Sequence, residues 1–273
     1  MRYETIRLSV PGAREPVELV AYAPDNFPTL GAERRRPAII LCPGGAYRMV
    51  AEGEGEPVAL RFAGLGCAVF LLRYHAGTPW PVPQRQLLAA VDYVRSGCEV
   101  YHVDPAAVLV MGFSAGGHLA ACAGTMWSRP ELYRPLKKRA AAFRPDGMIL
   151  CYPVVSSGPA GHRPSFENLL GERYEELAEA VSIERCVRAT TPPVFLWHTA
   201  DDTTVPVENA LLLREALEAR GVPVECHIFP HGSHGQSLAD PACFPPERAW
   251  RLSVPCGAWV EWCRAWIRRN YGG

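Results

Sequence analysis

VLVMGFSAGGHLAACAGTMW, residues 108–127, is the most informative stretch of the chain about its architecture. It starts as an apolar run, passes through the glycine-rich sequence 112–116, and continues as an alanine-rich run to Trp127. A stretch of this length without Asp, Glu, Lys or Arg resembles a membrane span. Its glycines, with Ser114 and His118, lower its hydropathy. We therefore interpret it as a buried strand, a tight turn and a buried helix in series.

The turn carries the sequence Gly112-Phe113-Ser114-Ala115-Gly116. A Gly-x-Ser-x-Gly sequence between a strand and a helix is typical of a nucleophile elbow. Such a turn has no room for side chains at its flanking positions, so glycines occupy them. The helix that follows points its free N–H groups toward the place where negative charge develops. We therefore interpret Ser114 as a nucleophile.

A serine hydroxyl needs a base, and the base needs an acid that orients it. In one common chain order the acid follows the serine and the histidine comes last. Asp201 and Asp202 both follow the apolar run 193–197, and the residues alone leave either one open as the acid. His231 and His234 follow the next apolar run, 224–229, and both are candidate bases.

Short apolar runs alternate with longer amphipathic runs along the rest of the chain. We expect strands at 3–10, 17–23, 37–42, 67–74, 108–111, 147–152, 193–197 and 224–229. We expect helices at 57–65, 83–97, 115–127 and 207–220, with a last helix inside 247–269. Two half-buried strands followed by strand–helix units predict an α/β fold, with a mostly parallel central sheet and helices on both faces.

No internal repeat or low-complexity linker divides the chain, so we expect a single domain over residues 1–273. Residues 159–188 form the one sizeable insertion between expected strands. This insertion is polar, with a helical piece near 173–181, and we expect it to form a short cap over the carboxyl edge of the sheet.

The composition disfavours several classes of protein. Lys+Arg and Asp+Glu both number 28, so no net field attracts nucleic acid or acidic lipid. The ten cysteines have no CxxC pair and no metal-ligand spacing, and several lie in apolar runs. The first residues are charged and lack the apolar core of a signal peptide. We therefore expect a cytoplasmic protein with reduced, buried thiols and no nucleic-acid or membrane partner. The oligomeric state stays open.

The chain resembles α/β-hydrolases of the esterase/lipase family, close to acetyl esterases and acetylxylan (BD-FAE-like) esterases. The resemblance extends from about residue 37 to the C-terminus. It is carried by PGGAY (43–47), GFSAGGHLAA (112–121), TPPVFLWHTADDTTVPVENA (191–210) and HIFPHGSHG (227–235). PGGAY is similar to an HGGG-type oxyanion loop, with Pro43 in place of the usual histidine. His75 stands where this family commonly has arginine.

The resemblance implies a role for individual residues. The family pattern D-x-x-V-P selects Asp202 as the acid, and the H-G ending selects His234 as the base. The oxyanion donors would be the N–H groups of Ala115, Gly45 and Ala46, with Gly44 as the alternative to Ala46. The resemblance implies no metal and no organic cofactor.

The expected activity is hydrolysis of a small carboxylic ester, with removal of acetyl groups from carbohydrate as the first choice. The alternatives are an arylformamidase-type amide hydrolase and a non-catalytic ligand-binding protein. The chain lacks a long hydrophobic lid, which disfavours a triglyceride lipase. Tyr47, Trp80 and Trp127 are candidates to line a sugar-sized pocket, with packing in the core as the alternative.

Overall fold

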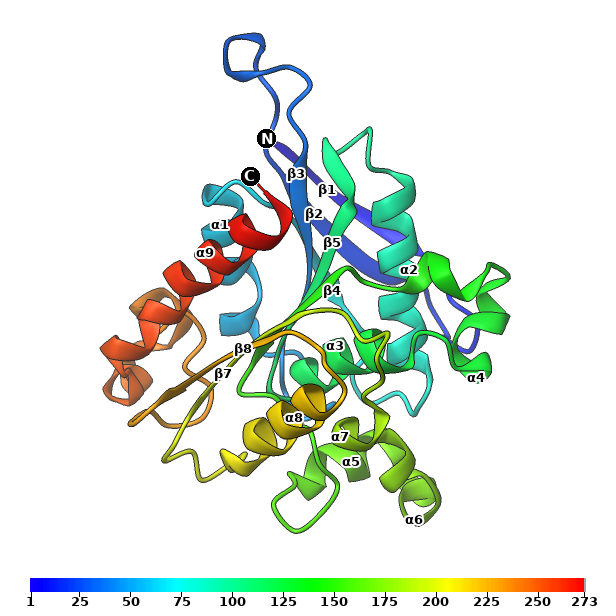
Figure 1. Ribbon diagram of the computed structural model, residues 1–273, viewed down its shortest axis with the longest axis vertical. Coiled ribbons are helices and arrows are strands. Elements are labelled where there is room, and N and C mark those ends of the chain that lie inside the picture. The colour runs from blue at the N-terminus through cyan, green and yellow to red at the C-terminus, as the bar shows by residue number, and fades with distance from the viewer. Residues whose placement is uncertain (273) are drawn as a thin grey trace.

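The computed structural model describes residues 1–272. Its centre is one sheet of eight strands in the order β1-β2-β4-β3-β5-β6-β7-β8 (Figure 1). The strands are β1 (Arg2–Leu8), β2 (Val17–Ala23), β3 (Arg36–Cys42), β4 (Ala68–Arg73), β5 (Val103–Phe113), β6 (Gly147–Cys151), β7 (Val194–Thr199) and β8 (Val224–Phe229). β2 pairs antiparallel with β1 and β4, and all pairs from β4 to β8 are parallel. The predicted α/β fold with a mostly parallel sheet is confirmed.

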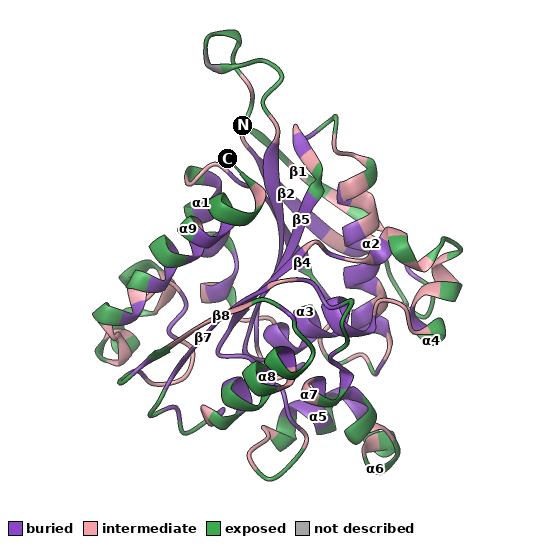
Figure 2. Cartoon of the chain, in the orientation of Figure 1, coloured by how far each residue is buried: buried purple, intermediate pink, exposed green. Residues whose placement is uncertain are grey.

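Helices cover both faces of this sheet (Figure 1). The longer helices are α1 (Glu56–Gly64), α2 (Val82–Ser96), α3 (Ser114–Met126), α8 (Glu208–Ala219) and α9 (Trp259–Tyr271). Successive strand residues alternate between two apolar clusters. Ile40 packs with residues of α2, α3 and α8, whereas Ile39 and Leu41 pack with residues of α1 and α9. β3, β6 and β7 are buried along their whole length, and β5 is buried from Ala107 to its end (Figure 2).

The uncharged stretch of the sequence forms the end of β5 and all of α3. Every residue of α3 is buried, which explains why this helix carries no charged side chain. No helix among residues 1–272 has the length and hydropathy needed to cross a membrane. β5 begins at Val103, earlier than the sequence predicts, because Asp104 and the exposed residues Pro105 and Ala106 interrupt the apolar pattern of the strand.

The insertion between β6 and β7 holds more helix than the sequence predicted. It contains α5 (Arg163–Leu170), α6 (Tyr174–Leu177) and α7 (Ile183–Cys186), joined by short 3₁₀ turns. Only the part near 173–181 had been expected to be helical. α5 was missed because its proline and polar residues obscure a buried apolar side formed by Phe166, Leu169 and Leu170.

Candidate active site

Ser114 lies at the junction of β5 and α3 with a positive φ of 52°. A Cβ placed on Gly112 would lie 2.0 Å from the carbonyl oxygen of Gly116. A Cβ on Gly116 would lie 2.1 Å from the carbonyl oxygen of Cys42. Neither position can therefore hold a side chain, and the left-handed backbone of Ser114 is the strained geometry that a nucleophile elbow requires.

Three of the expected site residues meet in one chain of hydrogen bonds. Ser114 Oγ is 2.8 Å from His234 Nε2, and His234 Nδ1 is 2.6 Å from Asp202 Oδ2. Asp202 follows β7 and His234 follows β8, so both lie beyond the carboxyl ends of strands next to each other in the sheet. These distances suit proton transfer from the serine to the histidine.

Asp202 is held in place by several donors. Its Oδ1 accepts from the backbone N–H groups of Thr204 (2.9 Å) and Val205 (3.0 Å), and His198 Nε2 lies 3.4 Å from its Oδ2. Burial by itself would raise the pKa of Asp202. The hydrogen bonds from His198, His234 and Val205 outweigh burial and hold that pKa well below its usual range. The carboxyl group is therefore ionised throughout the neutral range.

The alternative pair, Asp201 and His231, lies apart from Ser114. Asp201 accepts from the N–H of Gly232 (2.7 Å), and its other oxygen is 3.3 Å from His231 Nδ1. The side chains of Asp201 and His231 are 51% and 84% exposed. Asp201 and His231, the alternative acid and the alternative base, thus pair with each other at the surface.

The loop after β3 turns sharply beside Ser114. Gly45, Ala46 and Tyr47 have positive φ values of 119°, 54° and 58°. A Cβ on Gly45 would lie 2.2 Å from the carbonyl oxygen of Met49, so only glycine fits there. Gly45 and Ala46 line the same cavity as Ser114.

The N–H of Gly44 donates to Glu54 Oε2 at 2.7 Å, so this group is already engaged. Within residues 1–272 the structure gives the N–H groups of Gly45 and Ala46 no such acceptor. Ala115 lies in the first turn of α3, where N–H groups have no partner within the helix. Of the two alternatives for the third donor, Ala46 therefore has its N–H free and Gly44 does not.

A cavity of about 920 Å³ surrounds Ser114 and His234. Its walls come from distant parts of the chain, including Arg48 on the loop after β3, His162 and Asn168 at α5, and Arg248 near the C-terminus. Asn168 Nδ2 donates to the carbonyl oxygen of Ala46 at 2.8 Å, which ties α5 to the loop beside Ser114.

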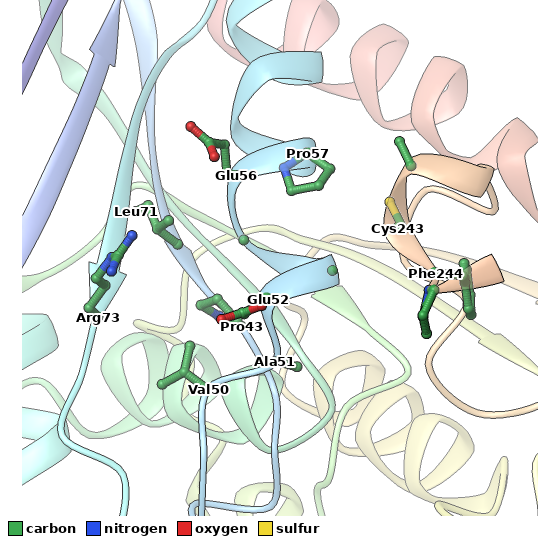
Figure 3. Close-up of a pocket in the computed structure, with 14 residues that line it drawn as sticks. Pro43, Val50, Ala51, Glu52, Glu56, Pro57, Leu71, Arg73, Cys243 and Phe244 are labelled. Atoms are coloured by element: carbon green, nitrogen blue, oxygen red, sulfur yellow. The ribbon is translucent and has the colours of Figure 1, made fainter. Parts of the chain in front are cut away.

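A second cavity of about 810 Å³ adjoins the first (Figure 3). Residues 50–53 and 243–245 line both cavities and so form the wall between them. A Cβ on Gly53 would lie 2.2 Å from the carbonyl oxygen of Cys243. The two backbones therefore touch at this point, and glycine at position 53 allows the contact.

The three predicted pocket aromatics do not line the cavity around Ser114. Tyr47 is buried, and its hydroxyl is 2.8 Å from His118 Nδ1. Trp80 is also buried, and Trp127 packs against the core at the end of α3. The structure therefore agrees with the alternative for these three residues, which was packing in the core. Residues such as Met49 and Phe244 line the cavity instead, and neither belongs to a periodic pattern in the sequence.

All ten cysteines are free thiols, and seven of them are buried. Burial raises the pKa of the thiols of Cys42 and Cys151, which keeps them protonated. Among residues 1–272, no group of three or more His, Cys, Asp or Glu side chains is placed to hold a metal ion.

Comparison with known proteins finds a family model that matches most of the chain. The model of the BD-FAE family matches residues 27–217, a range that includes Ser114 and Asp202 and ends before His234. Endo-1,4-beta-xylanase B of Butyrivibrio fibrisolvens is 33% identical over 216 residues, 77% of this chain and 34% of that protein. The acetylxylan esterase of Xylanibacter ruminicola is 33% identical over 208 residues, 72% of this chain and 40% of that protein. The chain thus spans about a third to two fifths of these relatives.

Two solved structures match almost the whole chain. The acetyl ester-xyloside bifunctional hydrolase of Caldicellulosiruptor lactoaceticus is 35% identical with a TM-score of 0.84, covering 99% of this chain and 97% of its own. The carboxylesterase Cest-2923 of Lactobacillus plantarum is 26% identical with a TM-score of 0.85, covering 98% of both chains. The names of these structures and of the acetylxylan esterase agree with the prediction of a serine esterase.

Proposed function

Because the chain belongs to the BD-FAE family, we propose that it is a serine carboxylesterase with Ser114 as nucleophile, His234 as base and Asp202 as the orienting acid. The observation that carries this proposal is the continuous hydrogen-bond chain from Ser114 Oγ through His234 to Asp202. The unengaged N–H groups of Gly45 and Ala46 in the same cavity support it further.

In the proposed reaction His234 Nε2 takes the proton of Ser114 as Oγ attacks the acyl carbon. Asp202 stays ionised and stabilises the imidazolium that forms. The N–H groups of Gly45, Ala46 and Ala115 bind the oxyanion of the tetrahedral intermediate, each contributing roughly 3 kcal/mol. The intermediate collapses, His234 protonates the leaving alcohol, and water then attacks the acyl-enzyme in the same way.

The proposed substrate is a small-molecule ester, with an acetylated carbohydrate as the first choice. Two relatives support this choice, since one is named an acetylxylan esterase and another an acetyl ester-xyloside hydrolase. The walls of the cavity include Arg48, Glu52, Arg248 and Arg251, whose charged groups can bind sugar hydroxyls.

We also propose that residues 1–273 act as a single domain, with the insertion at 159–188 as a short cap. The contact of α5 with the loop beside Ser114 supports this role for the insertion. The cytoplasmic location stays a prediction from the sequence.

The direct test of the activity is Ser114→Ala. We expect this variant to lose more than about 1,000-fold in kcat for p-nitrophenyl acetate, because the acyl-enzyme can no longer form. Its melting temperature should stay close to that of the wild type. Ser96→Ala, an exposed serine at the end of α2, is the matched control and should keep full activity. Turnover that persists in Ser114→Ala would reject the mechanism.

The substrate class is tested with a panel that varies one feature at a time. With p-nitrophenyl esters, kcat/KM should fall at least about tenfold from acetate to octanoate, because a long acyl chain would lie beside the charged groups of Arg48, Arg248 and Arg251 in the cavity wall. Acetylated xylo-oligosaccharides should be deacetylated, and formylkynurenine should be a poor substrate. A maximum at long chains would indicate a lipase-like site, and a preference for formylkynurenine would indicate an arylformamidase.

A further inference from the structure

Glu54 is a buried acid that the mechanism above does not use. It ends a short 3₁₀ turn, Glu52–Glu54, between β3 and α1. Its Oε2 accepts from the N–H of Gly44, and its Oε1 accepts from the hydroxyl of Tyr152, both at 2.7 Å. A Cβ on Gly44 would lie 2.7 Å from Glu54 Oε2 and 2.9 Å from Ser114 Cβ, so the carboxyl group and the serine flank the same glycine.

The hydrogen bonds around Glu54 favour its ionised form. The N–H of Ser237 donates to the hydroxyl oxygen of Tyr152 at 2.8 Å, so the Tyr152 proton is available for Glu54. Both carboxyl oxygens of Glu54 then act as acceptors, which is the pattern of an ionised carboxylate. Bonds of this kind to a charged acceptor are short and strong.

Ionisation at this position is unfavourable for folding. Burial raises the pKa of Glu54 above its ordinary value, against the bonds from Tyr152 and Gly44 and the nearby His234, which lower it. A buried carboxylate is costly unless its partners compensate fully. Costly groups of this kind are found where activity is gained at the expense of stability.

The network joins two of the loops that carry the active site, the one after β3 and the one after β8. Gly44 directly precedes Gly45 and Ala46, the proposed oxyanion donors. Ser237 lies three residues after His234, and its Oγ also donates to the carbonyl oxygen of Gly53 at 2.7 Å. The ring of Tyr152 packs edge-on against the imidazole of His234, with 5.1 Å between ring centroids. One carboxylate therefore holds the loop after β3 and, through Tyr152, the loop after β8.

We propose that Glu54 is a positioning residue for ester hydrolysis, whose carboxylate fixes the oxyanion loop through Gly44 and the histidine loop through Tyr152 and Ser237. This inference rests on the proposed function. It assigns Glu54 no contact with the substrate and predicts an effect on the transition state rather than on substrate binding.

Glu54→Gln tests the inference, because it keeps the shape but removes the charge and one acceptor. We expect kcat for p-nitrophenyl acetate to fall about 10- to 100-fold, the range for losing a charge-assisted hydrogen bond, with KM changed less than about threefold. The melting temperature should stay the same or rise, since a buried charge is removed. A role in stability alone predicts the opposite pattern, a lower melting temperature with unchanged kcat, and that result would overturn the inference.

Tyr152→Phe removes the hydroxyl that donates to Glu54 and accepts from Ser237, and it leaves the bond from Gly44 to Glu54 in place. We expect a smaller fall in kcat, about 3- to 10-fold, at similar KM. Tyr22→Phe is the matched control: its hydroxyl donates to Glu56 at 3.1 Å, and its loss should leave kcat unchanged. If Glu54→Gln does not fold, Tyr152→Phe decides, and an unchanged kcat in it overturns the inference.

Measurements on the wild type distinguish a failure of this inference from a failure of the proposed function. A wild type that neither hydrolyses p-nitrophenyl acetate nor reacts with a fluorophosphonate at Ser114 would overturn both. An active wild type, with kcat unchanged in folded Glu54→Gln and in Tyr152→Phe, would overturn only the role of Glu54.

Discussion

Asp201 and Asp202 carry the same side chain at neighbouring positions, and their surroundings separate them. Asp202 is selected by the D-x-x-V-P pattern, and the structure gives that pattern a physical basis. Its Oδ1 accepts from the N–H groups two and three residues ahead, a side-chain turn that fixes the carboxylate toward His234. The tight turn at Ser114 could be predicted because Gly112 and Gly116 mark positions that have no room for a side chain.

Glu54 could not be predicted in the same way. It lies in the sequence Glu-Gly-Glu-Gly-Glu (52–56), which is typical of a solvated, charged turn. Glu52 and Glu56 are exposed as that pattern suggests, and Glu54 is buried. Its partners lie far apart in the chain: Gly44 and Ser237 are 193 positions apart, and Tyr152 lies between them. Only the fold brings them together.

Asp202→Asn provides a prediction about pH. The pKa of Asp202 is lowered in the folded state, so its charge stabilises the fold at every pH above its unfolded value near 3.9. That stabilisation is lost as the pH falls further, toward the lowered folded value. We expect the wild type to exceed Asp202→Asn in melting temperature by a constant amount from about pH 5 to 7, and by a shrinking amount below about pH 4.

Thermal melts of both proteins from pH 7 to pH 3 measure this difference. Asp201→Asn is the matched control, because its carboxylate is half exposed and should change the melting temperature little at any pH. A gap between wild type and Asp202→Asn that widened on acidification would contradict the assignment of a lowered pKa.

At the scale of elements, strands were easier to predict than the helices around the site. The bounds expected for β2 and β8, 17–23 and 224–229, agree with the structure, since turn residues delimit both runs. α9 was expected inside 247–269 and begins only at Trp259, because prolines at 246 and 255 keep the preceding residues in 3₁₀ turns. The residues before α9, which these prolines keep out of the helix, form part of the cavity wall.

The elbow itself gives a prediction about stability. Gly112→Ala should destabilise the fold by roughly 3 kcal/mol or more, because its methyl group would meet the backbone oxygen of Gly116 at 2.0 Å. Gly64→Ala is the matched control at the end of α1, where a Cβ meets nothing within 4 Å. It should be neutral or stabilise by about 0.5 kcal/mol. Urea unfolding of both variants measures these values, and a stable Gly112→Ala would contradict the tight approach of β5 and α3.

At the scale of the whole molecule, the parallel sheet explains why the active-site residues meet. β5, β7 and β8 all run in the same direction, so the residues that follow them collect at one edge of the sheet. This convergence follows from topology and could be predicted from the alternation of strands and helices. The cavity could not, because residues 48–54, 162–168 and 243–251 are far apart in the sequence and only the folded chain brings them together. Tyr47, Trp80 and Trp127 have the chemistry of sugar-binding side chains, but they pack in or against the core.

The central claim is that Ser114 is the nucleophile, and covalent labelling tests it most directly. The protein is incubated with a fluorophosphonate, digested and mapped by mass spectrometry, with Ser114→Ala treated in parallel. We predict one adduct per chain, on the peptide that contains Ser114, and none on the variant. An unlabelled wild type, or an adduct on any other residue, would contradict the account.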